Sequence, residues 1–299
     1  MNGKKIFTTL KKPMCLISNE IHLGQQLYGV NLGARMLTEN NNKIPVYQGC
    51  LPQTEKHFNT YKSFPDIYNR TMLDVHNIYN KNLELQNGFH LPFNLGGDHS
   101  ISIGSVQASL KTYQDLVKVI WIDAHADIHH IDSSTSKNLH GMPIGFLMNK
   151  MEQIPKWCKE YKLEPEQILY IGLRDVDEYE LNFLKENNID FISMQMLQNY
   201  SLKDLLEVLD DSELFPYIHL SIDVDSIDPL YFPSTGTPSP NGLNPEDILD
   251  IISFYHPQIV GMDLVEFNPH IGNKDDILQS FQIANSIIQH TYRLSSTLH

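Results

Sequence analysis

Two segments, Val117–Ile122 and Tyr217–Ile222, are largely apolar or aromatic, and they constrain the fold more than any other feature of the chain. Strands that are covered on both faces have this composition, whereas strands with one solvated face alternate apolar and polar residues. Similar short runs recur along the chain, with helix-like segments between them. This alternation predicts right-handed strand–helix–strand units, and therefore a parallel sheet with helices packed on its faces.

The expected strands are Met14–Ser18, His90–Leu95, Val117–Ile122, Ile168–Gly172, Phe191–Ser193, Tyr217–Ile222 and Val260–Leu264. The expected helices are Ile101–Tyr113, Glu178–Asn187, Leu202–Leu209, Pro245–Tyr255 and Asp275–Arg293. Asn244 is a favourable capping residue for the fourth helix, and Pro245 suits its first position. Because no repeat or linker interrupts the pattern, we expect residues 1–299 to form one domain.

Acidic and imidazole side chains stand directly after several of these strands, where open α/β sheets bind their ligands. After the strand that ends at Ile122, an i, i+2, i+4 spacing places three such side chains on one side of an extended segment. The candidate metal ligands are His99, Asp123, His125, Asp127, Asp223 and Asp225. Glu266 follows the strand Val260–Leu264 in the same way.

A mixed set of imidazole and carboxylate ligands suits a divalent cation such as Mn²⁺. Six ligands are more than one tetrahedral zinc needs, and they match two metals about 3.5–4 Å apart if some carboxylates bridge. Burying these groups together without a cation would cost several kcal/mol for each uncompensated charge. The cysteines, Cys15, Cys50 and Cys158, form no C-x-x-C pair, so thiolates are not expected to take part.

The net charge is −14, from 22 basic and 36 acidic residues, which disfavours nucleic acid and anionic membranes as partners. No continuous apolar stretch reaches the 18 residues of a membrane span, and Met14–Ser18 is too short for the apolar core of a signal peptide. The few scattered cysteines are typical of reduced thiols. We therefore expect a soluble protein of the cytoplasm.

Several segments together resemble the signature blocks of the arginase/agmatinase (ureohydrolase) family. In chain order they are LGGDHS, WIDAHADI, SKNLHGMP, YIGLRDVD, LSIDVDSIDP, TGTP and GMDLVEFNP, between Phe93 and Pro269, with a weaker likeness at Gly29–Gly33. The resemblance implies a three-layer αβα fold with a mostly parallel sheet of about eight strands. It also implies two Mn²⁺ ions per chain, one held by His99, Asp123, Asp127 and Asp223, the other by Asp123, His125, Asp223 and Asp225.

The resemblance implies hydrolysis of L-arginine to L-ornithine and urea by a hydroxide that bridges the two metals. Two cations make a bound water acidic enough to attack the poorly electrophilic guanidinium carbon. By the same resemblance Asp127 relays a proton, His140 shuttles protons and Glu266 pairs with the guanidinium group. Residues that would bind or surround the rest of the substrate are Ser136 and Asn138 at its carboxylate, Asp177 at its ammonium, and Thr237 in the guanidinium pocket.

The chain departs from the arginase pattern in three places. His129 replaces an asparagine that contacts the substrate carboxylate; a histidine can also donate to a carboxylate, or can signal another substrate. No arginine stands near Glu246, where arginases use one in subunit contacts, so the trimer or hexamer implied by the resemblance lacks one of its usual contacts. The early Asp-x-Gly-Pro element reads Asn31-Leu32-Gly33-Ala34, which we expect to affect local structure only.

Two alternatives to an arginase stay open. One is a related enzyme that acts on another guanidino or formimino compound, such as agmatine, guanidinobutyrate or formiminoglutamate. The other is a non-catalytic homologue that keeps the metal site for stability, because a bound metal stabilises a folded chain. Retention of His140 and Glu266, which are not metal ligands, argues against the second alternative. A single-zinc deacetylase is disfavoured by the complete two-metal ligand set.

Overall fold

The computed structural model describes residues 12–50, 52–54, 56, 63–150 and 154–297. Its centre is one sheet of eight strands, all paired in parallel, in the order β2-β1-β3-β8-β7-β4-β5-β6. The strands are β1 Met14–Asn19, β2 Val46–Gln48, β3 Leu91–Gly96, β4 Val117–Ile122, β5 Ile168–Leu173, β6 Asp190–Ser193, β7 Tyr217–Asp223 and β8 Ile259–Val265. The predicted parallel sheet is confirmed.

Each of the seven predicted strands is present, with its ends within one residue of the prediction. The eighth strand, β2, was not predicted. It has three residues at the edge of the sheet, and Val46 and Gln48 are exposed while Tyr47 is only half-buried. A short strand on the edge of a sheet buries little surface and therefore needs no run of apolar residues. Its sequence then shows no hydrophobic periodicity from which a strand could be predicted.

The longer helices are α1 Val30–Asn40, α3 Phe64–Asn87, α4 Ser102–Tyr113, α7 Glu178–Glu186, α9 Leu202–Val208, α10 Pro245–Tyr255 and α11 Lys274–Thr297. Shorter ones are α5 Pro143–Leu147, α6 Lys156–Lys159 and α8 Met194–Leu197. All five predicted helices form, although α11 continues four residues beyond its expected end. Asn244 caps α10 as predicted, by accepting a hydrogen bond from the Asp247 amide at 3.1 Å.

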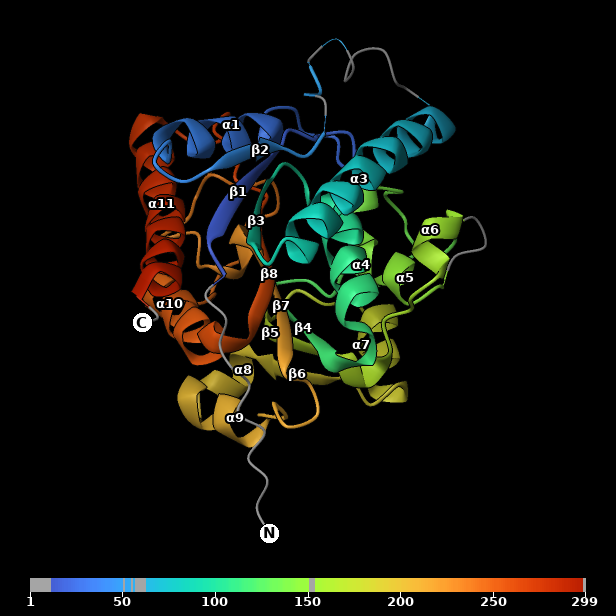
Figure 1. Ribbon diagram of the computed structural model, residues 1–299. Helices are drawn as coiled ribbons and strands as arrows, with labels where there is room; N and C mark the ends of the chain where they lie inside the picture. Colours follow the sequence, from blue (N-terminus) through green and yellow to red (C-terminus); the bar gives the residue numbers. More distant parts are fainter. Residues whose placement is uncertain (1–11, 51, 55, 57–62, 151–153, 298–299) are drawn as a thin grey trace.

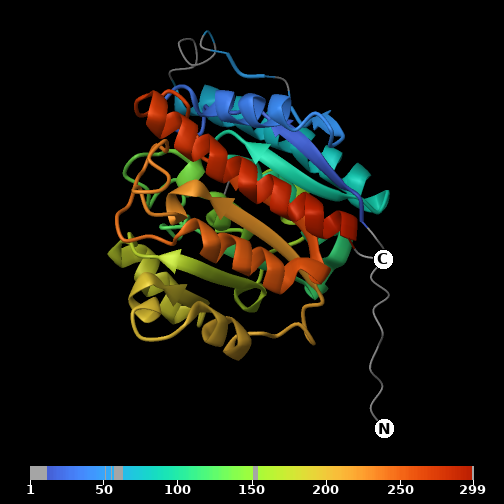
Figure 2. The same ribbon diagram turned by 90° about the vertical axis from the view of Figure 1, so that its left-hand side faces the viewer.

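Helices cover both faces of the sheet, which gives the three-layer αβα arrangement (Figure 1). Helices α1, α8, α9, α10 and α11 pack on one face, and Figure 2 looks onto the part of that layer formed by α10 and α11. Helices α3, α4, α5, α6 and α7 pack on the other face. Strands β4, β7 and β8 are buried along nearly their whole length between the two layers, as the apolar sequences of the first two predicted.

The strand that comes last along the described chain, β8, lies in the middle of the sheet. It pairs with β3 through Phe93, Asn94 and Leu95, and on its other side with β7. The arrowheads visible in Figure 2 point to the same side, so the carboxyl ends of the strands form one edge of the sheet. Residues that follow β3, β8, β7 and β4 are thereby brought together from positions far apart in the chain.

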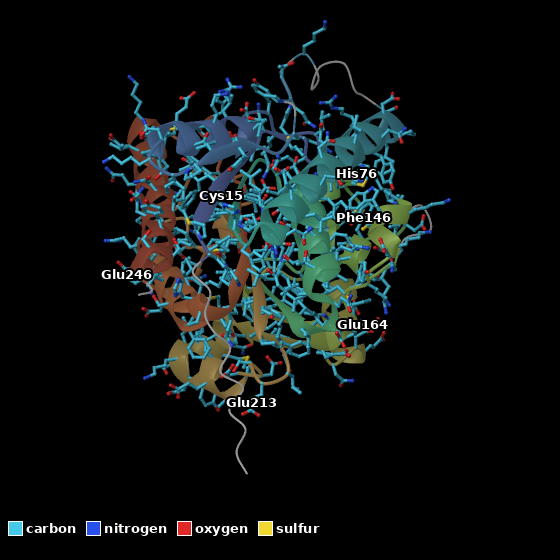
Figure 3. All side chains as sticks on the ribbon, viewed as in Figure 1. Cys15, His76, Phe146, Glu164, Glu213 and Glu246 are labelled. Atoms are coloured by element: carbon cyan, nitrogen blue, oxygen red, sulfur yellow. The ribbon has the colours of Figure 1, made fainter. Side chains whose placement is uncertain are left out.

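The structure bears on two predictions made from composition, the state of the cysteines and the lack of a membrane-spanning segment. Cys15, Cys50 and Cys158 are all buried free thiols, and Figure 3 marks the place of Cys15. Burial raises the pKa of both Cys15 and Cys158 to about 12, which keeps these thiols protonated and unreactive. Within the described ranges, no helix combines the length and the apolar character needed to span a bilayer.

Candidate metal centre

Four neighbouring strands in the middle of the sheet deliver the predicted site residues to one edge. His99 begins the short 3₁₀ turn His99–Ile101 after β3, and Asp123 is the first residue after β4. Asp223 is the last residue of β7, and Glu266 follows β8 directly. Asp127 and Glu266 both have positive φ, 52° and 69°. This region is unfavourable for residues other than glycine, and such strain is typical of functional sites that the surrounding fold holds in place.

Three carboxylates converge on one nitrogen of His99. Its Nδ1 lies 3.2 Å from Asp123 Oδ2, 3.1 Å from Asp127 Oδ2 and 3.2 Å from Asp223 Oδ2. The side chain is fully buried, yet Nδ1 has no partner that satisfies hydrogen-bond geometry. A buried polar atom without a hydrogen bond is rare and costly, and a cation shared with the three carboxylates would satisfy it. The arrangement therefore fits a metal ion.

The imidazole of His99 is held so that Nδ1 points at those carboxylates. Its other nitrogen, Nε2, is 3.0 Å from Ser221 Oγ, and its ring stacks on Trp121 with 4.2 Å between centroids and 9° between planes. Trp121 also donates from Nε1 to Asp123 Oδ2 at 3.1 Å. Partners behind a ligand histidine fix its orientation and its tautomer, which is how metal sites are usually preorganised.

A second group of potential ligands lies beside the first and shares Asp123 with it. His125 Nδ1 is 3.4 Å from Asp123 Oδ1 and 3.1 Å from Asp225 Oδ2. Thr237 donates from Oγ1 to Asp225 Oδ2 at 2.8 Å, so the predicted pocket residue contacts a candidate ligand. With Asp123 between the two groups, the site offers ligand sets for two cations joined by a common carboxylate.

The buried carboxylates raise one another's pKa values. Burial, together with the charges of Asp225 and Asp123, raises the pKa of Asp223 well above its usual value. Burial and the charge of Asp123 raise the pKa of Asp127 to about 6. Several like charges this close are unfavourable unless positive charge lies among them. The electrostatics of the site thus favour divalent cations, as the sequence predicted.

A polar network with no solvent exposure lies behind this site and was not predicted. At its centre is Asp263 on β8, whose Oδ2 accepts from Ser102 Oγ at 2.7 Å and Ser105 Oγ at 2.8 Å and lies 3.1 Å from His219 Nε2. Ser221 Oγ connects Asp263 to the candidate ligand His99, at 3.3 Å and 3.0 Å. The network therefore supports the imidazole of His99 on the side away from the carboxylates.

Glu266 and His140 form a pair beside the carboxylate clusters. Glu266 Oε1 lies 3.1 Å from His140 Nδ1 and accepts from the His99 amide at 2.9 Å. Its other oxygen accepts from Gln25 Nε2 at 2.5 Å. Burial alone would lower the pKa of His140, but the charge and the hydrogen bond of Glu266, together with the charges of Asp127 and Asp98, outweigh burial and raise this pKa to about 9. Glu266 is 1% exposed, so its carboxylate lies behind His140 rather than on an open surface.

A cavity of about 250 Å³ opens over the clusters. Its wall is mainly acidic and imidazole side chains, and it is lined by His125, Asp127, His129, His140, Gly141, Asp175, Asp177, Glu180, Asp223, Asp225 and Thr237. The lining thus includes eight of the predicted site residues, among them His129. The other five, His99, Asp123, Glu266, Ser136 and Asn138, are not part of it. Ser136 is exposed, and its Oγ accepts from the Asn138 amide at 3.2 Å.

Three residues in or beside this cavity, Asp175, Glu180 and Gln25, were not predicted from the sequence. Glu180 is 6% exposed, and burial with the charge of Asp127 raises its pKa to about 7. It stands at the third position of α7, where an acidic residue reads as part of a capping box, and its side chain does accept from the Asp177 amide. Gln25 comes from a loop after β1 that carries no recognisable pattern.

His129 and Asp177 contact each other on the cavity wall. His129 Nε2 lies 2.9 Å from Asp177 Oδ2, and its Nδ1 lies 3.0 Å from Ser133 Oγ. The ring stacks on Tyr179, with 5.1 Å between centroids and 17° between planes. Asp177 also caps α7, because its Oδ1 accepts from the Glu180 amide at 2.9 Å. Two residues that the sequence assigned to different groups of a substrate, its carboxylate and its ammonium, therefore contact one another.

The Arginase family model matches residues 14–292. An arginase of Schizosaccharomyces pombe is 38% identical over 224 residues, which are 72% of this chain and 68% of the relative. An arginase of Saccharomyces cerevisiae is 39% identical over 66% of this chain, and the match spans just under two thirds, 63%, of that relative's length. An arginase of Staphylococcus aureus is 32% identical over 89% of this chain and 93% of its own.

Solved structures share the fold. The arginase of Entamoeba histolytica, in complex with L-ornithine, superposes with a TM-score of 0.78 at 24% identity over 95% of this chain and 99% of its own. The formimidoylglutamase of Bacillus subtilis superposes with a TM-score of 0.75 at 18% identity, over 100% of this chain and 90% of its own. At these identities the likeness shows the three-layer architecture, and it leaves the substrate to be argued from the site.

Proposed function

This chain belongs to the arginase family, and from that premise we propose that it hydrolyses L-arginine to L-ornithine and urea in a Mn²⁺-dependent reaction. The observation that supports the proposal most strongly is the pair of ligand groups joined at Asp123, with the unbonded Nδ1 of His99 aimed at three carboxylates. Such a site is arranged for cations, and it lies at the base of a cavity large enough for a small molecule.

We propose that two Mn²⁺ ions bind here. The residues that would hold them are His99, Asp123, Asp127 and Asp223 for one ion, and Asp123, His125, Asp223 and Asp225 for the other. When bound, the metals would supply the positive charge that makes water a nucleophile at neutral pH. Carboxylate and imidazole ligands suit Mn²⁺, and the three buried cysteines lie outside both ligand groups.

The remaining site residues have roles that follow from their chemistry. Asp127 faces the cavity and would accept a proton from the attacking water and pass it to the leaving amine. His140, with its raised pKa, would carry protons between the cavity and solvent. Glu266 would pair with the guanidinium, since carboxylate and guanidinium match in a bidentate way. Thr237 would line the guanidinium pocket from its position on Asp225.

At the other end of the substrate, Ser136, Asn138 and His129 would lie near the carboxylate and Asp177 near the ammonium group. We also propose that the protein acts in the cytoplasm as a homo-oligomer, without nucleic acid or membrane as a partner. Three buried free thiols fit a reducing compartment. Trimers and hexamers are distinguishable by sedimentation of the Mn²⁺-loaded protein.

The direct test is product release after incubation with Mn²⁺ and after chelation. We expect Mn²⁺-dependent urea from L-arginine, and neither urea from agmatine nor formamide from N-formimino-L-glutamate. The Asp223→Ala variant should lose both bound Mn²⁺ and turnover, whereas Asp250→Ala, at an exposed position on α10, is the matched control for removing a carboxylate. Formamide release from formiminoglutamate with no urea from arginine would contradict the proposal and identify the alternative substrate.

A further inference from the structure

We propose that His129 sets substrate selectivity by bonding to the carboxylate of Asp177, which would otherwise bind an α-ammonium group. The enzyme would then discriminate only weakly between guanidino acids that have an α-ammonium group and those that lack one. The inference rests on the proposed function and concerns the same cavity. Its substrate class is the ω-guanidino carboxylates, which include arginine and its deaminated counterpart, 5-guanidinopentanoate. The observation that carries it is the 2.9 Å contact between His129 Nε2 and Asp177 Oδ2.

Besides the candidate metal ligands, the cavity wall contains three carboxylates that would attract a cationic substrate group. They are Asp175, Asp177 and Glu180. Asp175 is 70% exposed at its side chain, and the side chain of Asp177 is 55% exposed. Glu180 is buried, and its carboxylate contacts the Asp177 amide. Asp177 is therefore both open to the cavity and fixed in place, which makes it the natural acceptor for an ammonium group.

Both oxygens of Asp177 already have donors. Oδ1 accepts from the Glu180 amide at 2.9 Å as the cap of α7, and Oδ2 faces His129 Nε2. A carboxylate only accepts hydrogen bonds, so Nε2 must carry the proton. Nδ1 lies 3.0 Å from the Ser133 hydroxyl, so both ring nitrogens have a partner. An ammonium group that approaches Oδ2 has to displace this donor or share the oxygen with it.

The imidazole is held firmly enough to compete. Tyr179 stacks on one face of the ring, and Ser133 binds the nitrogen opposite Asp177. Only 20% of the His129 side chain is exposed. With its Nε2 proton directed at Asp177, the ring has no donor free for a substrate carboxylate in this arrangement. His129 thus acts on selectivity through Asp177 and is a positioning residue.

The test compares L-arginine with 5-guanidinopentanoate, which lacks only the ammonium group. The measured quantity is the ratio of their kcat/KM values for urea release by the Mn²⁺-loaded protein. His129→Asn shortens the side chain and frees Asp177 Oδ2, so the ratio should rise about tenfold in favour of arginine, the factor expected for one charge-assisted hydrogen bond. Asp177→Asn should change the ratio little on its own, and should cancel the gain when combined with His129→Asn.

The matched control is His130→Asn. This histidine is on the same loop and also contacts Tyr179, at 5.8 Å between centroids, but it does not line the cavity. A merely structural loss in the loop would lower both kcat/KM values together and leave their ratio unchanged. The proposal is overturned if His129→Asn leaves the ratio unchanged, if His130→Asn shifts it equally, or if Asp177→Asn lowers it tenfold while His129 is present.

Failure of the proposed function is a separate outcome. If neither compound releases urea, the arginase assignment fails, and the affinities of the same two compounds for the Mn²⁺-loaded protein are compared by calorimetry instead. We then expect the ratio of the two affinities to rise about tenfold in favour of arginine in His129→Asn, and this rise to be absent in the double variant with Asp177→Asn. An unchanged binding ratio overturns the selectivity proposal whether or not the protein turns over.

Discussion

Removing the carboxylate of Asp263 should destabilise the protein severely, although this residue touches neither the cavity nor a proposed metal. Asp263 is fully buried and is the common partner of His219, Ser102 and Ser105, at 3.1, 2.7 and 2.8 Å. Asp263→Ala removes their common acceptor from the core. Breaking a buried charged network in this way costs about 3–5 kcal/mol. Asp263→Asn keeps the shape and one acceptor, and should cost about half as much.

The assay is urea unfolding at pH 7 with a chelator present, followed by tryptophan fluorescence, so that metal binding does not contribute. Asp250→Ala is the control for removing an exposed carboxylate and should stay within about 0.5 kcal/mol of the parent. Burial would raise the pKa of Asp263, but His219 and the hydroxyl donors outweigh burial and hold it below its usual value. A lowered carboxyl pKa stabilises the fold above the unfolded value near 4, and this stabilisation is lost as pH falls through the folded pKa.

The difference in stability between the parent and Asp263→Asn should therefore begin to shrink as pH falls below about 4, and it should close only when pH has passed the lowered pKa of the folded carboxyl. Because Ser221 joins Asp263 to His99, the Asn variant should also bind Mn²⁺ about 10–100-fold more weakly. A loss of less than about 1 kcal/mol for Asp263→Ala, with unchanged Mn²⁺ affinity, would refute the reasoning that this network is an obligatory support of the site.

Three further predictions concern the metal, His140 and Arg174. Chelation should lower the melting temperature, and added Mn²⁺ should raise it again as its concentration increases, since a ligand that binds only the folded state stabilises that state. Calorimetry with and without Mn²⁺ measures the melting temperature, and an unchanged value would contradict a resident metal. In the chelated protein, the raised pKa of His140, about 9, should stabilise the parent relative to His140→Asn by roughly 1–3 kcal/mol below pH 6.5, and this margin should disappear as pH rises through 9. Denaturation at pH 6 and pH 9.5 measures it, and a margin that is equal at both pH values would contradict the pairing with Glu266. Arg174 donates to the backbone oxygens of Asp225 and Ser239, at 2.6 Å each. Arg174→Ala should therefore loosen the segment between these two residues and reduce Mn²⁺ affinity, and Arg174→Lys should retain only part of that affinity. Hydrogen exchange at Thr237 and its neighbours measures the loosening.

The elements that could be predicted from the sequence are those whose buried faces consist of apolar residues without interruption. The central strands and α10 are of this kind. Helix α3 escaped prediction although Ser63 caps it, because its buried face includes Asp74, Asn82 and Gln86, which interrupt the apolar stripe. Helix α1 likewise buries Asn31 and Gly33. Polar side chains on an inner face find partners only through tertiary contacts, and those contacts cannot be read from a local period.

The same reasoning applies to the site. Its candidate ligands were predictable because parallel strands align their carboxyl ends, so residues that follow different strands had to meet. Gln25 and Glu180 were not, since one comes from an irregular loop and the other reads as a helix cap. Nor does spacing along the chain reveal that His129 and Asp177, 48 residues apart, bind each other rather than separate partners.

The central place of β8 has a consequence for the order of assembly. This strand is made after every other strand in the described chain, yet it separates β3 from β7 in the finished sheet. While the chain is being synthesised, the β3 side and the β7 side have no common neighbour, and His99 has no fixed position relative to Asp223. We therefore expect the candidate ligands to stay in two separate groups until residues 259–265 have left the ribosome, because the insertion of this strand into the middle of the sheet is what joins the two groups.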